Sequence, residues 1–265
     1  MIEAIRQLFA ARDVVYAEAI PFSEAKILFQ RKIDQLSFVP QSVIIFAIPY
    51  YAGEMPERNL SRYAVAKDYH LFFRVFSDEL KKDLQRLYPN AAFCAFADNS
   101  PIDEREAAAK AGLGILGMNR LLITEKYGSY VFLGEFLTDL TYEEIGTLTS
   151  FVVKECEKCG ACLAACPKKE TCLSALTQKK GELTREEAEE ILSLGSVWGC
   201  DTCQEVCPHS QKAKITPIEY FKEDLIAQLT PEAVENMSEE EFARRAYSWR
   251  GRKTILRNLL LFDKT

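Results

Sequence analysis

Eight of the nine cysteines of this 265-residue chain fall between positions 156 and 207, and their spacing constrains the fold more than any other feature. The first run, at 156–167, reads C-x2-C-x2-C-x3-C-P. The second run, at 200–208, reads C-x2-C-x3-C-P, and Cys172 stands between the two runs. Thiolates at this spacing, closed by a proline, are typical of the ligands of paired [4Fe–4S] clusters. The sequence therefore predicts an iron–sulfur redox protein.

The spacing also predicts which cysteine serves which cluster. Three thiolates two residues apart can hold three corners of one cluster, and the fourth, next to proline, reaches the neighbouring cluster, as in bacterial two-cluster ferredoxins. The expected ligands are Cys156, Cys159, Cys162 and Cys207 for cluster one, and Cys166, Cys200 and Cys203 for cluster two. The last corner of cluster two is open to Cys172, which is near in sequence, or less favourably to Cys94, which lies far upstream in a predicted strand.

Other uses of paired cysteines fit the sequence less well. Zinc sites also use C-x2-C pairs, but four cysteines within eleven residues closed by Cys-Pro suit an iron–sulfur cluster better. Disulfides need an oxidising compartment, and the first residues lack the basic and apolar regions of a secretion signal. No stretch reaches the roughly 18 apolar residues of a membrane span. We expect a soluble, cytoplasmic chain that is monomeric and has no membrane partner.

The charge balance argues against a generally basic nucleic-acid binder, since the formal net charge is −6. A local basic patch nevertheless lies near the C-terminal end, interleaved with Tyr247 and Trp249. Its cations are Arg244, Arg245, Arg250, Arg252, Lys253 and Arg257. The same segment also fits the solvated face of a helix, because apolar residues recur at helical spacing from 255 to 260. The patch alone does not decide between these two interpretations.

The first 140 residues alternate between strand-like and helix-like patterns. Runs of apolar, β-branched and aromatic residues predict strands at 14–20, 42–50, 91–97, 121–124 and 130–138. Apolar residues at steps of three and four predict helices at 22–36, 67–87 and 103–111. Further helices are predicted at 184–194, 231–236, 238–247 and 251–261.

These patterns predict an α/β (α+β) fold in three parts. Residues 1–150 form a sheet domain, 151–215 form a bacterial-ferredoxin-like module with two [4Fe–4S] clusters, and 216–265 form a C-terminal helical segment.

The segment 112–117 matches the G-x-G-x-x-G pattern of dinucleotide-binding folds, but its context does not. That fingerprint needs a strand before the glycines and a helix after them. Here the glycines follow a predicted helix and precede a strand-like run. We therefore expect Gly112 to end the helix, and the glycines to allow a close backbone approach to a ligand other than a nicotinamide.

Several segments taken together resemble the epoxyqueuosine reductase family. Besides the cysteine runs, they are 97–105, 110–123, 128–135, 62–64, 68–70 and 256–259. The resemblance implies a cobalamin-binding α/β domain joined to the two-cluster module, as in corrinoid reductive dehalogenases. It implies reduction of epoxyqueuosine to queuosine in tRNA, and it favours Cys172 as the last ligand of cluster two. The implied partners are tRNA, bound through the basic patch, and an external electron donor such as flavodoxin or ferredoxin.

Asp98 is the expected catalytic acid. Removing an epoxide oxygen to leave an alkene consumes two electrons and releases water, so it needs an electron path, a low-potential metal centre and a proton source. Asp98 matches the family's acid in an Asp-x-x-Pro segment, and an apolar cleft would raise the pKa of such a carboxyl toward a useful range. By family position, Asp98, Gly117, Asn119 and Gln204 are the expected cofactor contacts.

Two other functions are compatible with the same residues. The chain could be an electron-transfer protein that serves a partner, in which case Asp98 is a turn or helix N-cap residue ahead of Pro101. It could also be a corrinoid reductase that acts on another small substrate.

Overall fold

The computed structural model describes residues 2–167 and 171–263, and the chain divides into two compact units. The first unit comprises Met1–Tyr50, Phe73–Gly160 and Pro208–Ile218. The second unit comprises Tyr51–Phe72, Ala161–Cys207 and Glu219–Thr265. The boundaries of these units do not coincide with the predicted ones at 150 and 215, and the division by function stays a prediction.

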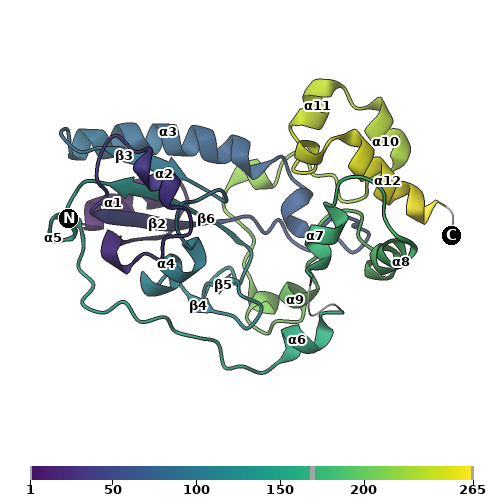
Figure 1. Cartoon of the computed structure of the whole chain (residues 1–265), viewed down its shortest axis with the longest axis horizontal. Coiled ribbons are helices and arrows are strands. Elements are labelled where there is room, and N and C mark those ends of the chain that lie inside the picture. Colours follow the sequence, from purple (N-terminus) through teal and green to yellow (C-terminus); the bar gives the residue numbers. More distant parts are fainter. Residues whose placement is uncertain (1, 168–170, 264–265) are drawn as a thin grey trace. The chain divides into compact units, whose positions relative to one another are not determined.

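A four-stranded antiparallel sheet forms the centre of the first unit (Figure 1). Its strand order is β1-β2-β6-β3, with β1 at Tyr16–Pro21, β2 at Ser42–Pro49, β6 at Val131–Thr138 and β3 at Phe93–Phe96. Every residue of β2 is buried, which explains its almost continuous apolar run. The fold is therefore mixed α/β, as predicted.

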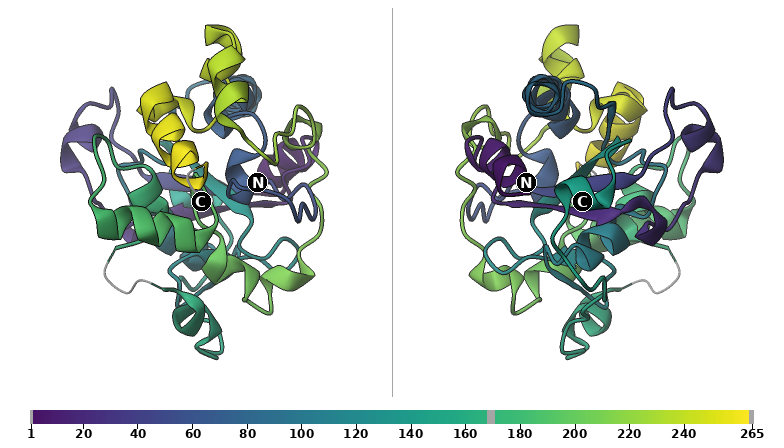
Figure 2. Two further views of the ribbon diagram at one scale, coloured as in Figure 1. Left: turned by 90° about the vertical axis from the view of Figure 1, so that its right-hand side faces the viewer. Right: turned by 90° about the vertical axis from the view of Figure 1, so that its left-hand side faces the viewer.

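Aromatic side chains cover one face of this sheet. Helix α1 (Ile2–Ala10) brings Phe9 to 4.8 Å from Phe46 of β2, measured between ring centroids. Helix α3 (Tyr69–Leu87) adds Phe76, whose ring centroid lies 5.6 Å from that of Phe46. Helix α3 and helix α4 (Glu104–Lys110) lie on opposite faces of the sheet (Figure 2).

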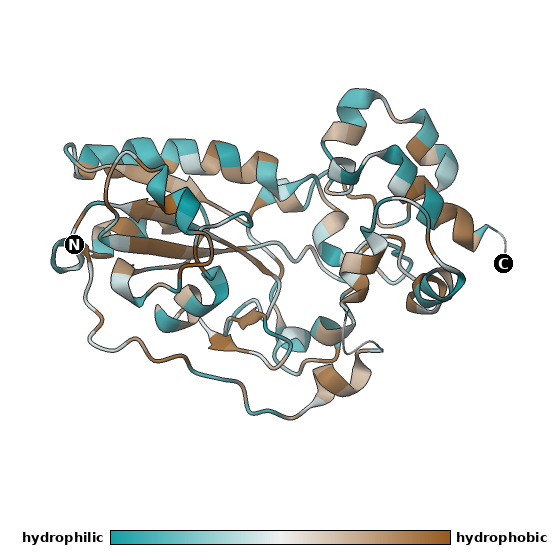
Figure 3. Cartoon of the chain, in the orientation of Figure 1, coloured by the Kyte–Doolittle hydropathy of each residue, from teal (hydrophilic) through white to brown (hydrophobic). Residues whose placement is uncertain are grey.

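Helix α4 (Glu104–Lys110) packs its buried alanines, Ala107 to Ala109, against Val43 and Ile45 on the other face of β2. Their small side chains let the helix approach the sheet closely. Figure 3 shows the result in its colours, with brown hydrophobic strands in the middle of the unit and teal turns on the outer side of α3.

The second unit is mainly helical. Its core surrounds Trp198 and Tyr247, whose ring centroids are 6.3 Å apart. Its helices are α6 (Ala161–Ala165), α7 (Leu173–Thr177), α8 (Arg185–Leu194), α9 (Thr202–Glu205), α10 (Pro231–Asn236), α11 (Glu239–Ala243) and α12 (Arg252–Phe262).

The remaining elements are short. They are α2 (Gln30–Asp34), β4 (Ile115–Leu116), β5 (Leu122–Ile123), α5 (Tyr142–Ile145), and the 3-10 turns Phe22–Glu24, Arg62–Ala64, Ser210–Lys212, Glu219–Phe221 and Ser248–Arg250. None of the described helices is long and apolar enough to cross a membrane.

All five predicted strands are confirmed within two residues at either end, and most predicted helices are confirmed as well. The helix predicted at 22–36 is wrong. Only a 3-10 turn and α2 form there, because the backbone between them pairs with the chain around Pro101. The N–H groups of Leu28 and Phe29 both donate to the Pro101 carbonyl, at 2.8 and 3.0 Å.

The helix predicted at 238–247 ends early, at Ala243. Beyond the helix, the backbone of Arg245 forms an isolated antiparallel β-bridge with Lys67, and Tyr247 is buried in the core of the second unit.

Candidate functional site

Asp98 lies in the loop between β3 and α4, and its backbone adopts an uncommon conformation. Its φ is +61°, in the left-handed region that residues other than glycine seldom occupy, although Asp tolerates it better than most. The side chain is exposed, so the apolar cleft expected around it is absent from this structure. The N-cap of α4 is Asp103, whose side chain accepts from the Glu106 N–H. The N-cap alternative for Asp98 is therefore wrong.

A pair of acidic side chains lies behind the Asp98 loop, and the sequence did not assign them a role. Glu135 comes from β6, where it faces Phe96 in the strand register and is completely buried. Glu104 comes from the first turn of α4, and its Oε1 accepts from the Asp98 N–H at 3.1 Å. A lone acidic residue inside the apolar strand 131–138 was the signal available in the sequence.

Both carboxyl groups of this pair bind protons more tightly than usual. Burial raises the pKa of Glu104 to about 7, against the lowering effect of its hydrogen bonds with Glu135 and with the Asp98 backbone. Burial, and next the charge of Glu104, raise the pKa of Glu135 well above its ordinary value. Because two adjacent carboxylates repel each other in a buried site, the pair retains a proton at neutral pH.

A pocket of about 450 Å³ adjoins the same loop. Its volume lies within the range of small-molecule sites. Phe73 and Phe96 contribute aromatic rings, and Lys32 contributes a cation that donates to the Asn99 carbonyl at 2.5 Å. The other lining residues are Gln35, Leu36, Cys94, Ala95 and Ala97.

The glycine segment forms the end of α4 and a tight hairpin. Gly112 has φ +73° directly after the helix, so the prediction that it ends α4 is confirmed. A Cβ at Gly114 would meet the Ile123 carbonyl oxygen at 2.3 Å, so β4 and β5 can approach only with glycine there. The order is helix and then strand, which confirms that the dinucleotide fingerprint does not apply.

Gly117 and Asn119 lie in the turn between β4 and β5. A Cβ at Gly117 would meet Oδ1 of Asn119 at 2.3 Å, and that oxygen accepts from the Leu121 N–H at 3.2 Å. The turn explains both residues in structural terms, and their contact with a cofactor stays a prediction.

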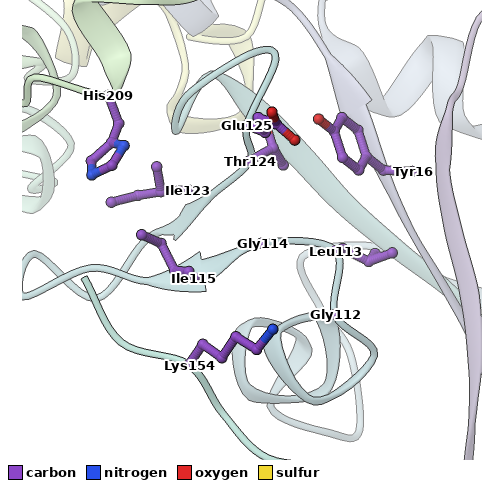
Figure 4. A pocket seen from close by; sticks show the side chains of 10 residues that line it. All are labelled: Tyr16, Gly112, Leu113, Gly114, Ile115, Ile123, Thr124, Glu125, Lys154 and His209. Atoms are coloured by element: carbon purple, nitrogen blue, oxygen red, sulfur yellow. The ribbon is translucent and has the colours of Figure 1, made fainter. Parts of the chain in front are cut away.

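A second pocket of about 320 Å³ follows the glycine segment, with Lys154 and His209 on opposite sides of that segment (Figure 4). His209 also pairs with Glu157 at 2.8 Å. This volume is near the lower limit for a small-molecule site, so the pocket fits part of a ligand and not a whole corrin ring.

The backbone around Cys156 and Cys159 has a form suited to a cluster. Lys158 and Gly160 both have positive φ, +57° and +78°, in a stretch of five residues. Such left-handed residues form concave turns of backbone N–H groups, which are common at iron–sulfur sites.

In the second unit, Cys162 on α6 and Cys203 on α9 belong to helices that pack together. Burial raises the pKa of the Cys200 thiol, and the charge of Cys172, which lies nearby, adds to this rise. Cys94, in contrast, lies on β3 in the sheet of the first unit.

Within residues 2–167 and 171–263, no three His, Cys, Asp or Glu side chains are gathered into a metal-binding group. The donor set and the local backbone fit two clusters, but the ligand assignments stay predictions from spacing.

Gln204 takes part in a buried polar network of the second unit. Its Nε2 donates to Oδ1 of Asp201 at 3.2 Å. Asp201 also accepts from the Arg62 N–H at 2.7 Å and forms an ion pair with Arg58 at 3.3 Å. A role of Gln204 in cofactor binding stays a prediction.

The basic patch divides into structural and exposed members. Arg257 donates to the carbonyls of Lys179 and Gly181, at 2.7 and 2.5 Å, and Arg252 donates to that of Met237 at 2.7 Å. Tyr247 is core and is unavailable for stacking. Trp249 is 57% exposed, with the Arg250 guanidinium 3.7 Å above its ring.

Comparisons with known proteins point in one direction. The family model described as "Epoxyqueuosine reductase QueG, DUF1730" matches residues 31–99. An epoxyqueuosine reductase of Lactococcus garvieae is 33% identical over 264 positions, covering 89% of this chain and 73% of that protein.

Two solved structures are similar over most of the chain. An epoxyqueuosine reductase bound to an epoxyqueuosine-modified tRNA-Tyr stem loop has a TM-score of 0.79 at 25% identity, covering 98% of this chain and 80% of that one. A Bacillus subtilis epoxyqueuosine reductase, described with its catalytic aspartate loop swung out of the active site, has a TM-score of 0.78 at 25% identity, covering 98% and 79%.

Proposed function

The chain belongs to the epoxyqueuosine reductase family, and we propose that it reduces epoxyqueuosine to queuosine in tRNA. The reaction takes up two electrons and two protons, breaks both carbon–oxygen bonds of the epoxide, forms the alkene and releases water. The observation that carries this proposal is the sequence identity with the Lactococcus garvieae enzyme along most of both chains.

Asp98 is the residue that we propose as the proton donor to the leaving oxygen. Its support is the resemblance of its Asp-x-x-Pro segment to that of the family, together with its place in an exposed loop and its left-handed φ. A related enzyme has a catalytic aspartate loop that swings out of the active site. An exposed Asp98 is compatible with a loop of that kind in its outward position.

We propose two [4Fe–4S] clusters and a cobalamin as cofactors. The clusters take the eight cysteines in the sets given by their spacing, with Cys172 in the last corner of cluster two. The cobalamin supplies a low-potential reduced cobalt, and Asp98, Gly117, Asn119 and Gln204 are the contacts proposed for it.

We further propose that tRNA binds at the exposed part of the basic patch. Trp249 offers a ring on which an unstacked base can lie, and the exposed Arg244 and Lys253 offer charge for phosphates. An external flavodoxin or ferredoxin is the proposed electron donor to the clusters.

An anaerobic reconstitution followed by a turnover assay tests the proposed function. The loaded protein should contain about eight irons per chain, as two four-iron clusters require, and one corrinoid. With a chemical reductant it should convert an epoxyqueuosine-containing stem loop to the queuosine form. Protein that loads both clusters and the corrinoid but leaves this RNA unchanged would overturn the proposed substrate. Protein that loads no corrinoid would overturn the proposed chemistry.

A further inference from the structure

We propose that Glu104 and Glu135 form a carboxyl pair that shares one proton and holds the Asp98 loop in place, with Glu104 as the positioning residue for Asp98. This inference rests on the proposed function, because it gives the pair a role in the step that Asp98 performs. Neither acidic residue is placed in direct contact with the substrate.

Two hydrogen bonds join the Asp98 loop to this pair. The Asp98 N–H donates to Oε1 of Glu104 at 3.1 Å, and the hydroxyl of Ser100 donates to Oε1 of Glu135. The Ser100 oxygen in turn accepts from the Ile102 N–H at 3.0 Å. Asp98 and Ser100 of the same loop therefore each donate a hydrogen bond to a different member of the carboxyl pair.

The left-handed backbone of Asp98 gives the first of these bonds its importance. A non-glycine residue in this region costs free energy and persists where its surroundings hold it. The Asp98 N–H donates to Glu104 from this strained conformation. Loss of that acceptor should let Asp98 relax toward ordinary φ values and move its carboxyl away from the position set by the loop.

The proton content of the pair decides whether it can hold the loop. Burial raises the pKa of Glu104 to about 7 and raises the pKa of Glu135 well above its ordinary value, so the pair shares one proton near neutral pH. In this state, a carboxylate at Glu104 accepts from Asp98 while a protonated Glu135 stays beside it. Loss of the last proton at alkaline pH puts two buried charges side by side and weakens the contact.

Four other titratable groups face the pair. The charge of Asp98 raises the pKa of Glu104 and that of Arg105 lowers it. The charge of Lys32 lowers the pKa of Glu135. Burial raises the pKa of the Cys94 thiol, and the charge of Glu135 adds to this rise. The two cations partly offset the repulsion within the pair, so they favour retention of a single charge.

Replacement of Glu104 by Gln and by Ala separates positioning from other roles. Gln keeps an oxygen that can accept from the Asp98 N–H, and its amide can donate to Glu135. We expect E104Q to keep kcat within about threefold of wild type at pH 7 and to lose the alkaline decline in kcat. We expect E104A to lower kcat at least tenfold with unchanged KM for the RNA and unchanged iron and corrinoid content. The matched control is E106Q, on the same helix but outside the pair, with wild-type kinetics.

A double variant tests whether Glu104 acts through Asp98. If it does, E104A added to D98N should cause no further loss of kcat, because the loop then carries no acid to position. A further tenfold loss would overturn the proposal, and so would an E104Q variant that is as impaired as E104A.

Hydrogen exchange gives a readout that does not depend on turnover. Peptides that cover 97–102 should exchange faster in E104A than in wild type, and at the wild-type rate in E104Q and E106Q. Unchanged exchange in E104A would overturn this inference even if the protein reduces epoxyqueuosine. Wild-type protein without turnover but with this exchange pattern would contradict the proposed function and leave the loop contact established.

Discussion

At the scale of single residues, Asp98 is the position on which we expect catalysis to depend most. Replacement of Asp98 by Asn removes the proton while keeping the size and the loop conformation, because Asn also tolerates left-handed φ. We expect kcat to fall by about 10²- to 10⁴-fold, the usual contribution of a general acid. Single-turnover kinetics with epoxyqueuosine-containing RNA measure this loss.

A matched surface change separates this effect from general damage. Asp78, on the exposed side of α3, offers the same Asp→Asn replacement away from the loop, and D78N should behave as wild type. Equal iron and corrinoid content in both variants is required. A D98N variant with wild-type turnover would favour an electron-transfer role, in which Asp98 is only a turn residue.

Glu135 makes stability depend on pH in a defined direction. The folded state raises the pKa of this carboxyl well above its ordinary value of 4.5, so folding favours the protonated form. This contribution is complete below about pH 4.5 and is lost as pH rises through the folded-state pKa. Between pH 5 and 8, wild type should therefore lose stability relative to E135Q.

Thermal midpoints of wild type, E135Q and the control E106Q at pH 5, 6.5 and 8 measure this difference. Each unit of pH across which one extra proton is held is worth about 1.4 kcal/mol. The E106Q curve should run parallel to wild type. Parallel curves for E135Q as well would mean that Glu135 is charged in the folded protein.

Cys172 and Cys94 give a paired test of the last ligand of cluster two. We expect C172S to lower the iron content from about eight toward about four per chain, because cluster two loses a corner. C94S should keep the full iron content, because Cys94 lies on a strand of the sheet. Iron analysis and the electron paramagnetic resonance signals of the reduced clusters measure both. The reverse pattern would reassign the corner to Cys94.

At the scale of secondary-structure elements, Asn258 shows how a family segment serves the fold. This side chain of α12 is completely buried, and its Nδ2 donates to the carbonyls of Thr177 and Val197 at 2.7 and 2.8 Å. The amide thus joins α12 to the end of α7 and to the chain before Trp198. An unsatisfied buried carbonyl costs about 1–3 kcal/mol.

Replacement of Asn258 by Ala should therefore lower the free energy of unfolding by roughly 2–4 kcal/mol, since two carbonyls lose a donor. Chemical denaturation of the loaded protein measures this change. Lys253, exposed on the same helix, provides the control K253A, with an expected change within about 0.5 kcal/mol. A similarly small change in N258A would mean that water replaces the amide at both carbonyls.

The elements that the sequence predicted well are those whose pattern reflects burial. The strands at 42–50 and 130–138 were predictable because every residue of β2 and the last five residues of β6 are buried. The prediction of a helix at 22–36 was wrong because the backbone of this segment pairs with Pro101. No local periodicity records such a contact between distant positions. Tyr247 of the basic segment is buried in the core beside Trp198, which is likewise a contact between distant positions.

The candidate site was predictable to the extent that its chemistry depends on spacing or on family segments. The cysteine intervals indicate ligands without any knowledge of the fold. The pairing of Glu104 with Glu135 was not predictable, because it joins a helix to a strand thirty-one residues away. The apolar neighbours of Glu135 in the sequence of β6 did indicate that its carboxyl is buried and has a partner.

At the scale of the whole molecule, the two units differ in the interactions that stabilise the elements within each of them. The first unit has an apolar core on both faces of its sheet. In the second unit, α6 buries no side chain and α9 buries only Gln204. Helices of four or five residues are unstable without tertiary contacts. We therefore expect the proposed clusters to order these two helices, since metal binding is coupled to folding in small cysteine-rich modules.

Removal of the clusters tests this difference between the units. After anaerobic extraction of iron with a chelator, amide hydrogen exchange in α6 and α9 should accelerate at least tenfold, whereas β2 and β6 should exchange as in the loaded protein. The sheet strands pair with each other and bury apolar side chains, so their protection does not depend on iron. Reloading with iron and sulfide should restore protection of both helices. Faster exchange in β2 and β6 as well would show that the clusters stabilise the whole chain, and unchanged exchange in α6 would show that its order comes from the protein alone.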